Sequence, residues 1–267
     1  MKLCRIISLI VFTAFLVIII HFFVRIFISD SFVVYGDSME PAFHQGQEVL
    51  VNKTIFGARL YKSLDFSDKK LKSCRMPGKR NIRVGDVVVF NYPYPYSNDT
   101  IAFKMNYVYV KRCYGSPGDS VRIKDGYYLL SGNKIGPKDF QSILSSTSDS
   151  ILRSMGVVLS SLQVNRTCGW TIKNFGPLYV PAKGDEICIN SSNFRIYRRL
   201  IQFETGSFPV LSTDKRSVIL NGSFLYRYRF KSNWYFLGGD NVMNSRDSRY
   251  IGLVPEEYII GVVSTPL

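Results

Sequence analysis

The sequence predicts a mostly β protein, in which an N-terminal transmembrane helix precedes a twisted antiparallel β-sheet core with an inserted β subdomain. Three observations support this fold class. One apolar run of bilayer length lies near the N-terminus. Aromatic residues make up 14% of the chain, and aromatic and β-branched residues favour strands. Beyond the apolar run, short strand-like segments alternate with turns, and hardly any helical periodicity is visible.

The apolar run, residues 6–24, is interrupted by only three polar residues, Ser8, Thr13 and His21. At 1.5 Å per residue it spans roughly 28 Å, close to the thickness of a bilayer core. A cleaved signal sequence usually has a shorter apolar region, about 7–15 residues, followed by a small-x-small site. The tripeptide "SDS" at residues 29–31 matches that site poorly. We therefore expect an uncleaved single-pass anchor, with a cleaved signal sequence as the alternative.

The charges around the run predict its orientation. Lys2 and Arg5 precede it, so the N-terminus should stay in the cytoplasm and the rest of the chain should lie on the extracytoplasmic face of the cytoplasmic membrane. The net charge of +14 indicates an anionic partner. In that location nucleic acid is not expected, and acidic lipid headgroups fit better. The basic segment 62–83 is predicted to be a surface loop, with membrane contact as its functional alternative.

The segments after the anchor predict how the chain is organised. Residues 83–90, 116–123 and 181–189 each place Gly-Asp before a β-branched run, which is typical of a turn followed by a strand. We expect four parts: a cytoplasmic tip and anchor (1–29), the first part of the catalytic core (30–123), an inserted β subdomain (124–232) and the second part of the core (233–267). The Ser-rich stretch "SILSSTSDSILRS" inside the insertion could be a short helix or a loop.

The five cysteines match no zinc-binding pattern, and we expect neither a metal nor a cofactor. A disulfide between Cys168 and Cys188 would fit an oxidising compartment. Unpaired cysteines without a chemical role are the alternative.

The stretch "FVVYGDSMEPAF", residues 32–43, presents Ser38 in a tight turn. A serine is a weak nucleophile until a base removes its proton. His21 lies inside the apolar run, and His44 is so close in sequence that the chain would have to fold straight back. "YGDS" also resembles the first block of the GDSL esterases, but no histidine follows residue 44 to complete their Asp-x-x-His pair. Neither histidine is therefore a good candidate for the base.

A lysine can replace histidine when its amine is neutral at working pH. Burial must then lower its pKa from about 10.4 by two or more units. The stretch "NYVYVKRCYGSPGD" contains Lys111, which on a strand shares a face with Tyr109 and Cys113. The adjacent Arg112 cannot be the base, because a guanidinium does not deprotonate in proteins. A solvated strand edge is the alternative interpretation of this Lys-Arg pair.

Four blocks, read in order, resemble the type I signal peptidases, which are membrane-bound serine proteases of the Ser/Lys type. The blocks are "GDSMEP", "GDVVVFNYP", "YVKRCYGSPGD" and "GGDNVMNSRDSRYIGLVPEEYIIG". They lie within residues 32–43, 83–93, 107–121 and 237–262. The chain length and "NFGPLYVP" are similar to longer members of the Bacteroidetes type.

The resemblance implies a role for each site residue. Ser38 would be the nucleophile and Lys111 the general base. Ser245 would hydrogen-bond the lysine amine and orient it. Asp247 and Arg249 would form a supporting ion pair, and Asp240 and Arg112 would brace the site.

The resemblance also implies an oxyanion site, and here the chain departs from part of the family. Gram-negative members carry a serine two residues before the nucleophile, where this chain has Gly36, as many Gram-positive members do. The oxyanion would then rest on the Ser38 backbone N–H and a contribution from Gly36. Losing one side-chain donor can cost about 3 kcal/mol.

The implied substrate is the signal peptide of an exported preprotein, cut after a small-x-small motif. Apolar residues near the dyad would line shallow pockets for those small side chains: Phe32, Val34, Met39, Phe43 and Val110. Two alternatives remain. One is another Ser/Lys peptidase, such as a conjugation-type processing protease. The other is a non-catalytic anchored protein that binds envelope partners, in which Ser38 and Lys111 could be replaced without consequence.

Overall fold

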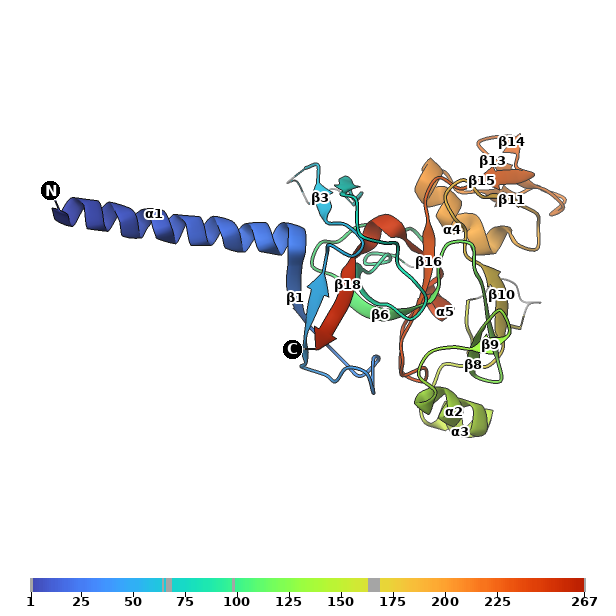
Figure 1. The fold of residues 1–267 in the computed structure, drawn as a ribbon. Coiled ribbons are helices and arrows are strands. Elements are labelled where there is room, and N and C mark those ends of the chain that lie inside the picture. Colours follow the sequence, from blue (N-terminus) through green and yellow to red (C-terminus); the bar gives the residue numbers. More distant parts are fainter. Residues whose placement is uncertain (1, 64, 66–68, 98, 163–168, 267) are drawn as a thin grey trace.

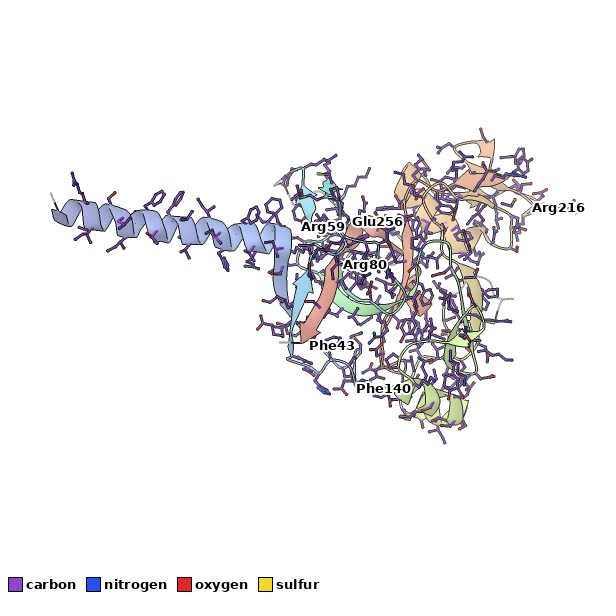
Figure 2. The ribbon with its side chains drawn as sticks, viewed as in Figure 1. Phe43, Arg59, Arg80, Phe140, Arg216 and Glu256 are labelled. Atoms are coloured by element: carbon purple, nitrogen blue, oxygen red, sulfur yellow. The ribbon has the colours of Figure 1, made fainter. Side chains whose placement is uncertain are left out.

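The computed structural model describes residues 2–63, 65, 69–97, 99–162 and 169–266. Helix α1 (Lys2–Phe23) and the π-helical segment η1 (Val24–Ile28) form one rod that projects from the body (Figure 1). Residues 5–28 are long and apolar enough to cross a membrane, and none of the hydrophobic window is buried in the protein. Figure 2 shows their side chains pointing outward all around the rod. The predicted N-terminal apolar helix is confirmed.

One curled antiparallel sheet of seven strands forms the centre of the body, in the order β1-β2-β18-β5-β6-β16-β17. Its strands are β1 (Ser29–Val33), β2 (Glu48–Asn52), β5 (Val87–Asn91), β6 (Val108–Gly115), β16 (Trp234–Gly238), β17 (Val254–Pro255) and β18 (Ile259–Pro266). Each neighbouring pair is antiparallel. The predicted mostly β, antiparallel fold is therefore confirmed.

Two apolar clusters hold this sheet. The larger one packs aromatic side chains around Trp234 and Phe236, both completely buried, and includes Tyr114 stacked on Tyr128 with ring centres 3.9 Å apart. The smaller cluster lies under the Ser38 turn. It contains Val34, Met39, Phe43, Val49 and Val87, with Phe32, Val110 and Val263 packed at its edge. The serine turn is thus supported by its own set of side chains.

Residues 124–232 contain further strands outside the main sheet. The end of β7 (Ser120–Lys124) enters this region, where β7 pairs with β8 (Tyr127–Leu130) and β10 (Phe175–Tyr179). The others are short: β9 (Asn133–Lys134), β11 (Glu186–Cys188), β12 (Val210–Leu211), β13 (Val218–Leu220), β14 (Ser223–Phe224) and β15 (Arg227–Arg229). Strands were expected here, and the structure adds helices to them.

Three of those helices lie in residues 124–232: α2 (Asp139–Ser146), α3 (Asp149–Ser154) and α4 (Phe194–Thr205). The first two occupy the Ser-rich stretch, and Ser148 separates them by capping α3, its hydroxyl accepting from the Ile151 N–H. Helix α4 buries residues at helical spacing, namely Phe194, Tyr197, Leu200 and Ile201. The expectation of hardly any helical periodicity was therefore wrong, because α4 has a clear apolar face.

The body also contacts the rod. A hairpin of β3 (Arg59–Tyr61) and β4 (Ser73–Arg75) lies beside η1, so part of the predicted surface loop 62–83 is a strand. The Lys53 amine donates to the Arg25 carbonyl at 2.6 Å and is 3.3 Å from the Asp30 carboxylate. These contacts tie the end of the helix to the sheet. Two short helices complete the chain, α5 (Ser248–Ile251) and η2 (Glu256–Tyr258).

Candidate active site

Ser38 lies in the turn that follows β1. Gly36 has φ +77°, a left-handed conformation that side chains other than glycine rarely adopt. The Glu40 N–H donates to the Asp37 carbonyl at 3.0 Å, which closes the turn around the serine. The Met39 side chain is completely buried in the smaller cluster. One side of the turn is thus anchored, while the Ser38 side chain remains partly accessible.

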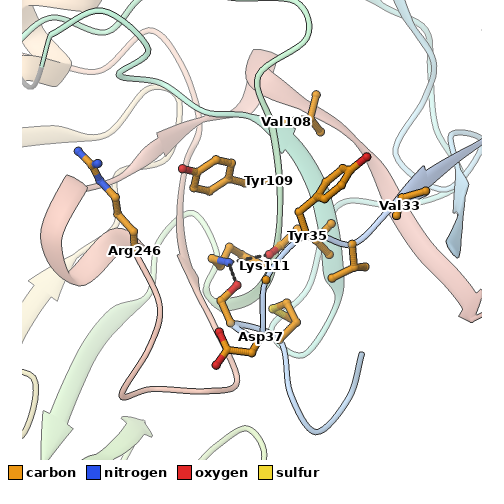
Figure 3. Close-up of a pocket in the computed structure, with 12 residues that line it drawn as sticks. Val33, Tyr35, Asp37, Val108, Tyr109, Lys111 and Arg246 are labelled. Carbon is orange, nitrogen blue, oxygen red and sulfur yellow. Dashed lines mark hydrogen bonds between the residues drawn. The ribbon is translucent and has the colours of Figure 1, made fainter. Parts of the chain in front are cut away.

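Lys111 comes to Ser38 from strand β6. Its Nζ lies 2.6 Å from Ser38 Oγ and donates to the Val110 carbonyl at 3.0 Å (Figure 3). Only 3% of the residue is exposed. Burial is the largest effect on this amine, and it lowers the pKa of Lys111 from 10.5 to about 8. At neutral to alkaline pH a substantial fraction of the amine is neutral, which is the form that can accept a proton.

The Asp247–Arg249 pair lies at the start of α5, and both side chains are fully buried. Two guanidinium nitrogens donate to the carboxylate at 2.9 and 2.8 Å, and a third donates to the Val242 carbonyl at 2.7 Å. Burial alone would raise the pKa of Asp247, but the Arg249 charge and hydrogen bonds hold it below its ordinary value. The carboxylate also accepts the Gly239 N–H at 3.0 Å, so the pair holds the loop after β16.

Arg112 and Asp240, which were expected to brace the site, form an ion pair next to the dyad. Arg112 donates to both Asp240 oxygens, at 2.7 and 2.6 Å. Burial would lower the pKa of Arg112, but the hydrogen bonds and charge of Asp240 raise it. The Tyr114 hydroxyl donates to the same carboxylate at 3.2 Å. Because Arg112 and Lys111 point to opposite faces of β6, this pair braces the strand that carries the lysine.

Ser245 is buried close to the dyad but differs from the expectation in one respect. Its Oγ has no hydrogen-bond partner among the described residues, so the predicted bond to the Lys111 amine is not formed. The position is tightly packed. A Cβ at Gly239 would lie 2.3 Å from Ser245 Oγ and 2.4 Å from the Ser38 carbonyl oxygen. Only glycine allows the loop to approach the serine this closely.

Sequence reasoning missed the contacts that join the serine turn to this loop. The Asn244 side-chain amide donates to the Asp37 carboxylate at 2.8 and 3.1 Å. The Asn241 backbone N–H donates to the Ser38 carbonyl at 3.2 Å. These residues stand in blocks already singled out, "GDS" and "GDNVMNS". Asparagine in these blocks indicates a turn, but a turn residue does not reveal a partner 207 positions away in the sequence.

The dyad opens into a cleft of about 310 Å³. Three of the predicted substrate-binding residues, Val34, Met39 and Val110, line it. Phe32 and Phe43 do not lie among its described lining residues and pack instead in the smaller cluster. The remaining lining residues are Val33, Tyr35, Gly36, Asp37, Val108, Tyr109 and Arg246. In the described residues the Ser38 backbone N–H donates to no protein acceptor, which leaves it available to the cleft.

The structure gives no support to the other candidate bases and ligands. His44 is exposed and lies 3.5 Å from the Glu40 carboxylate, with no contact to Ser38 among the described residues. Cys74, Cys113 and Cys188 are free thiols. Cys168 lies outside the described residues. Within the described part of the chain, no three His, Cys, Asp or Glu side chains form a cluster that could hold a metal ion.

The fold and the cleft together define a class of protein: an antiparallel β body behind an apolar helix, with a serine beside a buried lysine. A family model described as signal peptidase, peptidase S26, matches residues 6–267. The chain therefore belongs to this family of peptidases.

Individual proteins are also similar to this chain. The chain is 27% identical over 255 residues to signal peptidase I of Buchnera aphidicola subsp. Baizongia pistaciae, covering 93% of this chain and 73% of that protein. It is 28% identical over 246 residues to signal peptidase I of subsp. Acyrthosiphon pisum, covering 90% and 68%. A crystal structure of a signal peptidase I from Enterococcus faecalis V583 is 17% identical, with a TM-score of 0.33, and covers 69% of this chain and 98% of that one.

Proposed function

We propose that this chain is a membrane-anchored serine endopeptidase that removes signal peptides from exported preproteins, with Ser38 as nucleophile and Lys111 as general base. The observation that carries the proposal is the 2.6 Å separation between Ser38 Oγ and a buried amine whose pKa is lowered to about 8. Family membership supports the reaction class, and the relatives named signal peptidase I support the substrate.

The proposed reaction proceeds through an acyl-enzyme. Neutral Lys111 accepts the Ser38 proton as Oγ attacks the scissile carbonyl carbon. The protonated amine then donates that proton to the leaving nitrogen, the C–N bond breaks, and an ester to Ser38 remains. Water attacks the ester carbonyl while Lys111 accepts its proton. When the ester bond breaks, Lys111 returns the proton to Ser38 Oγ.

The oxyanion would be stabilised mainly by the backbone. The Ser38 N–H donates to no acceptor among the described residues, so it is free to donate to a substrate oxygen in the cleft. Gly36 has no side-chain donor, and its contribution is to hold the turn in its left-handed conformation. The Asp247–Arg249 and Asp240–Arg112 pairs would act by positioning the loop and the strand that carry the dyad.

The proposed location is the extracytoplasmic face of a bacterial cytoplasmic membrane, with α1 as a single-pass anchor. The apolar, unburied helix and the basic residues Lys2 and Arg5 before it support this orientation. The β3–β4 hairpin, whose first strand lies beside η1, carries exposed lysines that acidic headgroups would attract: Lys62, Lys69, Lys70 and Lys72. Nucleic acid is not a proposed partner.

We also propose that residues 30–123 and 233–267 form one catalytic core into which the subdomain 124–232 is inserted. The seven-stranded sheet supports this division, because β16 and β18 come from the second part and pair with strands of the first, while β17 extends the sheet beside β16.

Cleavage of a preprotein in detergent across pH 6–10 tests the proposal. We expect kcat/KM of the unaltered protein to rise with pH through an apparent pKa near 8, because only neutral Lys111 can act as base. Ser38→Ala and Lys111→Met should each lose at least about 100-fold in kcat/KM. Lys215→Met, at an exposed lysine in the β12–β13 turn, is the matched control.

Two outcomes would contradict the proposal. If Lys111→Met keeps its activity, the dyad is wrong and His44 becomes the candidate base. If the unaltered protein cleaves no preprotein, a non-catalytic anchored protein explains the structure better.

A further inference from the structure

Asp37 directly precedes the proposed nucleophile and lines the cleft that holds the dyad, but it has no part in the chemistry described above (Figure 3). Val34 and Met39, on either side of the serine turn, are buried. Residues 35 and 36 between them are exposed, so packing does not fix the middle of the turn. The orientation of Ser38 therefore depends on the hydrogen bonds that its turn makes with other segments.

Hydrogen bonds to the turn come from the loop 239–245, which follows β16. The Asp37 carboxylate accepts two from the Asn244 side-chain amide, at 2.8 and 3.1 Å, and a longer one from the Asn241 amide at 3.4 Å. The Asn241 backbone N–H donates to the Ser38 carbonyl at 3.2 Å. Within the loop, the Asn244 N–H donates to the Asn241 carbonyl at 3.1 Å, so both asparagines belong to one turn. That single turn of the loop holds both Asp37 and Ser38.

The loop itself is fixed relative to Lys111. Near its start, Asp240 forms the ion pair with Arg112, which is adjacent to Lys111 on β6. In its middle, the Val242 carbonyl accepts from the buried Arg249 guanidinium at 2.7 Å. A side chain that is bonded to this loop is therefore held in a fixed position relative to the strand that carries the base.

We propose that Asp37 is a positioning residue for the cleavage reaction: its carboxylate fastens the serine turn to the loop 239–245, and this contact sets the approach of Ser38 Oγ to the Lys111 amine. The role rests on the proposed function, because it needs Ser38 and Lys111 to act as a dyad. Small displacements of a nucleophile lower the rate of reaction strongly. Asn244 is exposed and Asp37 is partly exposed, so water competes for these hydrogen bonds and limits the effect to about ten-fold.

The charges near Lys111 provide a second way to detect the Asp37 carboxylate. Burial is the largest effect on this amine and lowers its pKa to about 8. The negative charges of Asp247, Asp240 and Asp37 raise the pKa, and the positive charge of Arg249 lowers it. Removing the charge of Asp37 should therefore lower the pKa of Lys111, an effect that a purely structural contact would not have. Other charged or titratable side chains around the amine are Arg112, Tyr109 and Arg246.

The first test exchanges the two partners of the contact and measures cleavage of one preprotein at alkaline pH, where Lys111 is neutral. Asn244→Asp places a second carboxylate against Asp37. We expect kcat to fall about five- to ten-fold, with KM changed by less than about two-fold, because the contact acts on Ser38 and not on the substrate. The double variant Asp37→Asn/Asn244→Asp restores one amide and one carboxylate, so kcat should return to within about two-fold of the unaltered enzyme.

The second test is the pH profile of kcat/KM. Asp37→Asn keeps an oxygen that can accept from Asn244 but removes the charge, so the apparent pKa should move to lower pH by about 0.2–0.7 of a pH unit. Asn244→Ala keeps the charge, and it should lower kcat while leaving the apparent pKa in place. An unchanged apparent pKa in Asp37→Asn would contradict the proposal, because the carboxylate would then not face Lys111.

Asn221→Asp is the matched control for an added carboxylate. Asn221 is exposed in the turn between β13 and β14, at the end of the body far from α1, and its φ of +51° suits aspartate as well (Figure 1). This variant should keep the kcat of the unaltered enzyme, and an equal loss in Asn221→Asp and Asn244→Asp would contradict the proposal.

Three results overturn the role of Asp37 alone: Asn244→Asp keeps its kcat, the double variant is as slow as Asn244→Asp, or the loss is confined to KM. Each of them requires that the unaltered enzyme cleaves the preprotein. If the unaltered enzyme cleaves no preprotein, the proposed function fails, and the role of Asp37 fails with it.

Discussion

Two groups of ion-paired residues in this protein each join a carboxylate to arginine, but one group is buried and the other is exposed. Asp247 and Arg249 are completely buried and 2.8 Å apart. On β11 and β15, Glu186 lies 3.1 Å from Arg227 and 3.6 Å from Arg229, with side chains that are 38%, 68% and 74% exposed. Exposed pairs contribute about 0–1 kcal/mol, whereas a buried charge left without its partner costs about 3–5 kcal/mol. The contribution of an ion pair to stability therefore depends more on its burial than on the presence of both charges.

The largest expected effect breaks the buried cluster. Asp247→Ala leaves Arg249 charged without its partner and removes the acceptor for the Gly239 N–H. We expect the free energy of unfolding to fall by about 3–5 kcal/mol. Glu186→Ala, the matched change in the exposed cluster, should cost less than about 1 kcal/mol. Denaturant unfolding in detergent measures both, and equal losses in the two variants would refute the distinction.

A second prediction concerns Lys111, whose burial disfavours its charged form. Its pKa is about 8 in the folded protein and about 10.4 when unfolded, so between these pH values the unfolded chain binds more protons. This amine therefore makes the free energy of unfolding of the unaltered protein rise as the pH is raised from 8 to 10.5. Lys111→Met lacks that gain. Its stability relative to the unaltered protein should therefore fall by about 3 kcal/mol over this range.

Unfolding free energies measured from pH 6 to 10.5 test this prediction, since other groups titrate equally in both proteins and cancel. Parallel stability curves would mean that Lys111 is not desolvated.

The smallest expected effect concerns Ser245, whose buried hydroxyl has no partner among the described residues. Ser245→Ala removes an unsatisfied polar group, so stability should stay the same or rise by up to about 1 kcal/mol. If the hydroxyl orients Lys111 only when substrate is bound, Ser245→Ala should lower kcat without lowering the free energy of unfolding. Parallel thermal unfolding and preprotein cleavage separate these effects. A clear loss of stability would show that the hydroxyl has a partner in the free protein.

The parts of the fold and site that could be predicted have local signals. The apolar run predicts α1 from its length alone. The alternation around Lys111 indicates a strand, and the structure has Lys111 on β6 with its Nζ 5.6 Å from the centre of the Tyr109 ring. Ser38 follows from its turn residues, and the Asp247–Arg249 ion pair follows from the family resemblance.

The rest depends on tertiary contacts that no local pattern encodes. Helix α4 mixes aromatic and β-branched residues with arginines, so strand and helix propensities conflict and packing decides. The Asn244–Asp37 contact joins segments 207 positions apart. The position of Phe43 behind the cleft depends on how β5 and β18 pack beneath the serine turn. Such contacts are determined only when the whole sheet is assembled.

The strand order has a consequence for biosynthesis. Strand β18 lies between β2 and β5, so the β1–β2 pair that leads to Ser38 reaches the strand of Lys111 only through a segment that ends at Pro266. Pairings this distant in sequence form late and slowly, because a long loop must close first. Until β18 has paired with both neighbours, the sheet does not hold the β1–β2 pair next to β5 and β6. The proposed pair of Ser38 and Lys111 is therefore expected to assemble only after the residues of β18 have been synthesised.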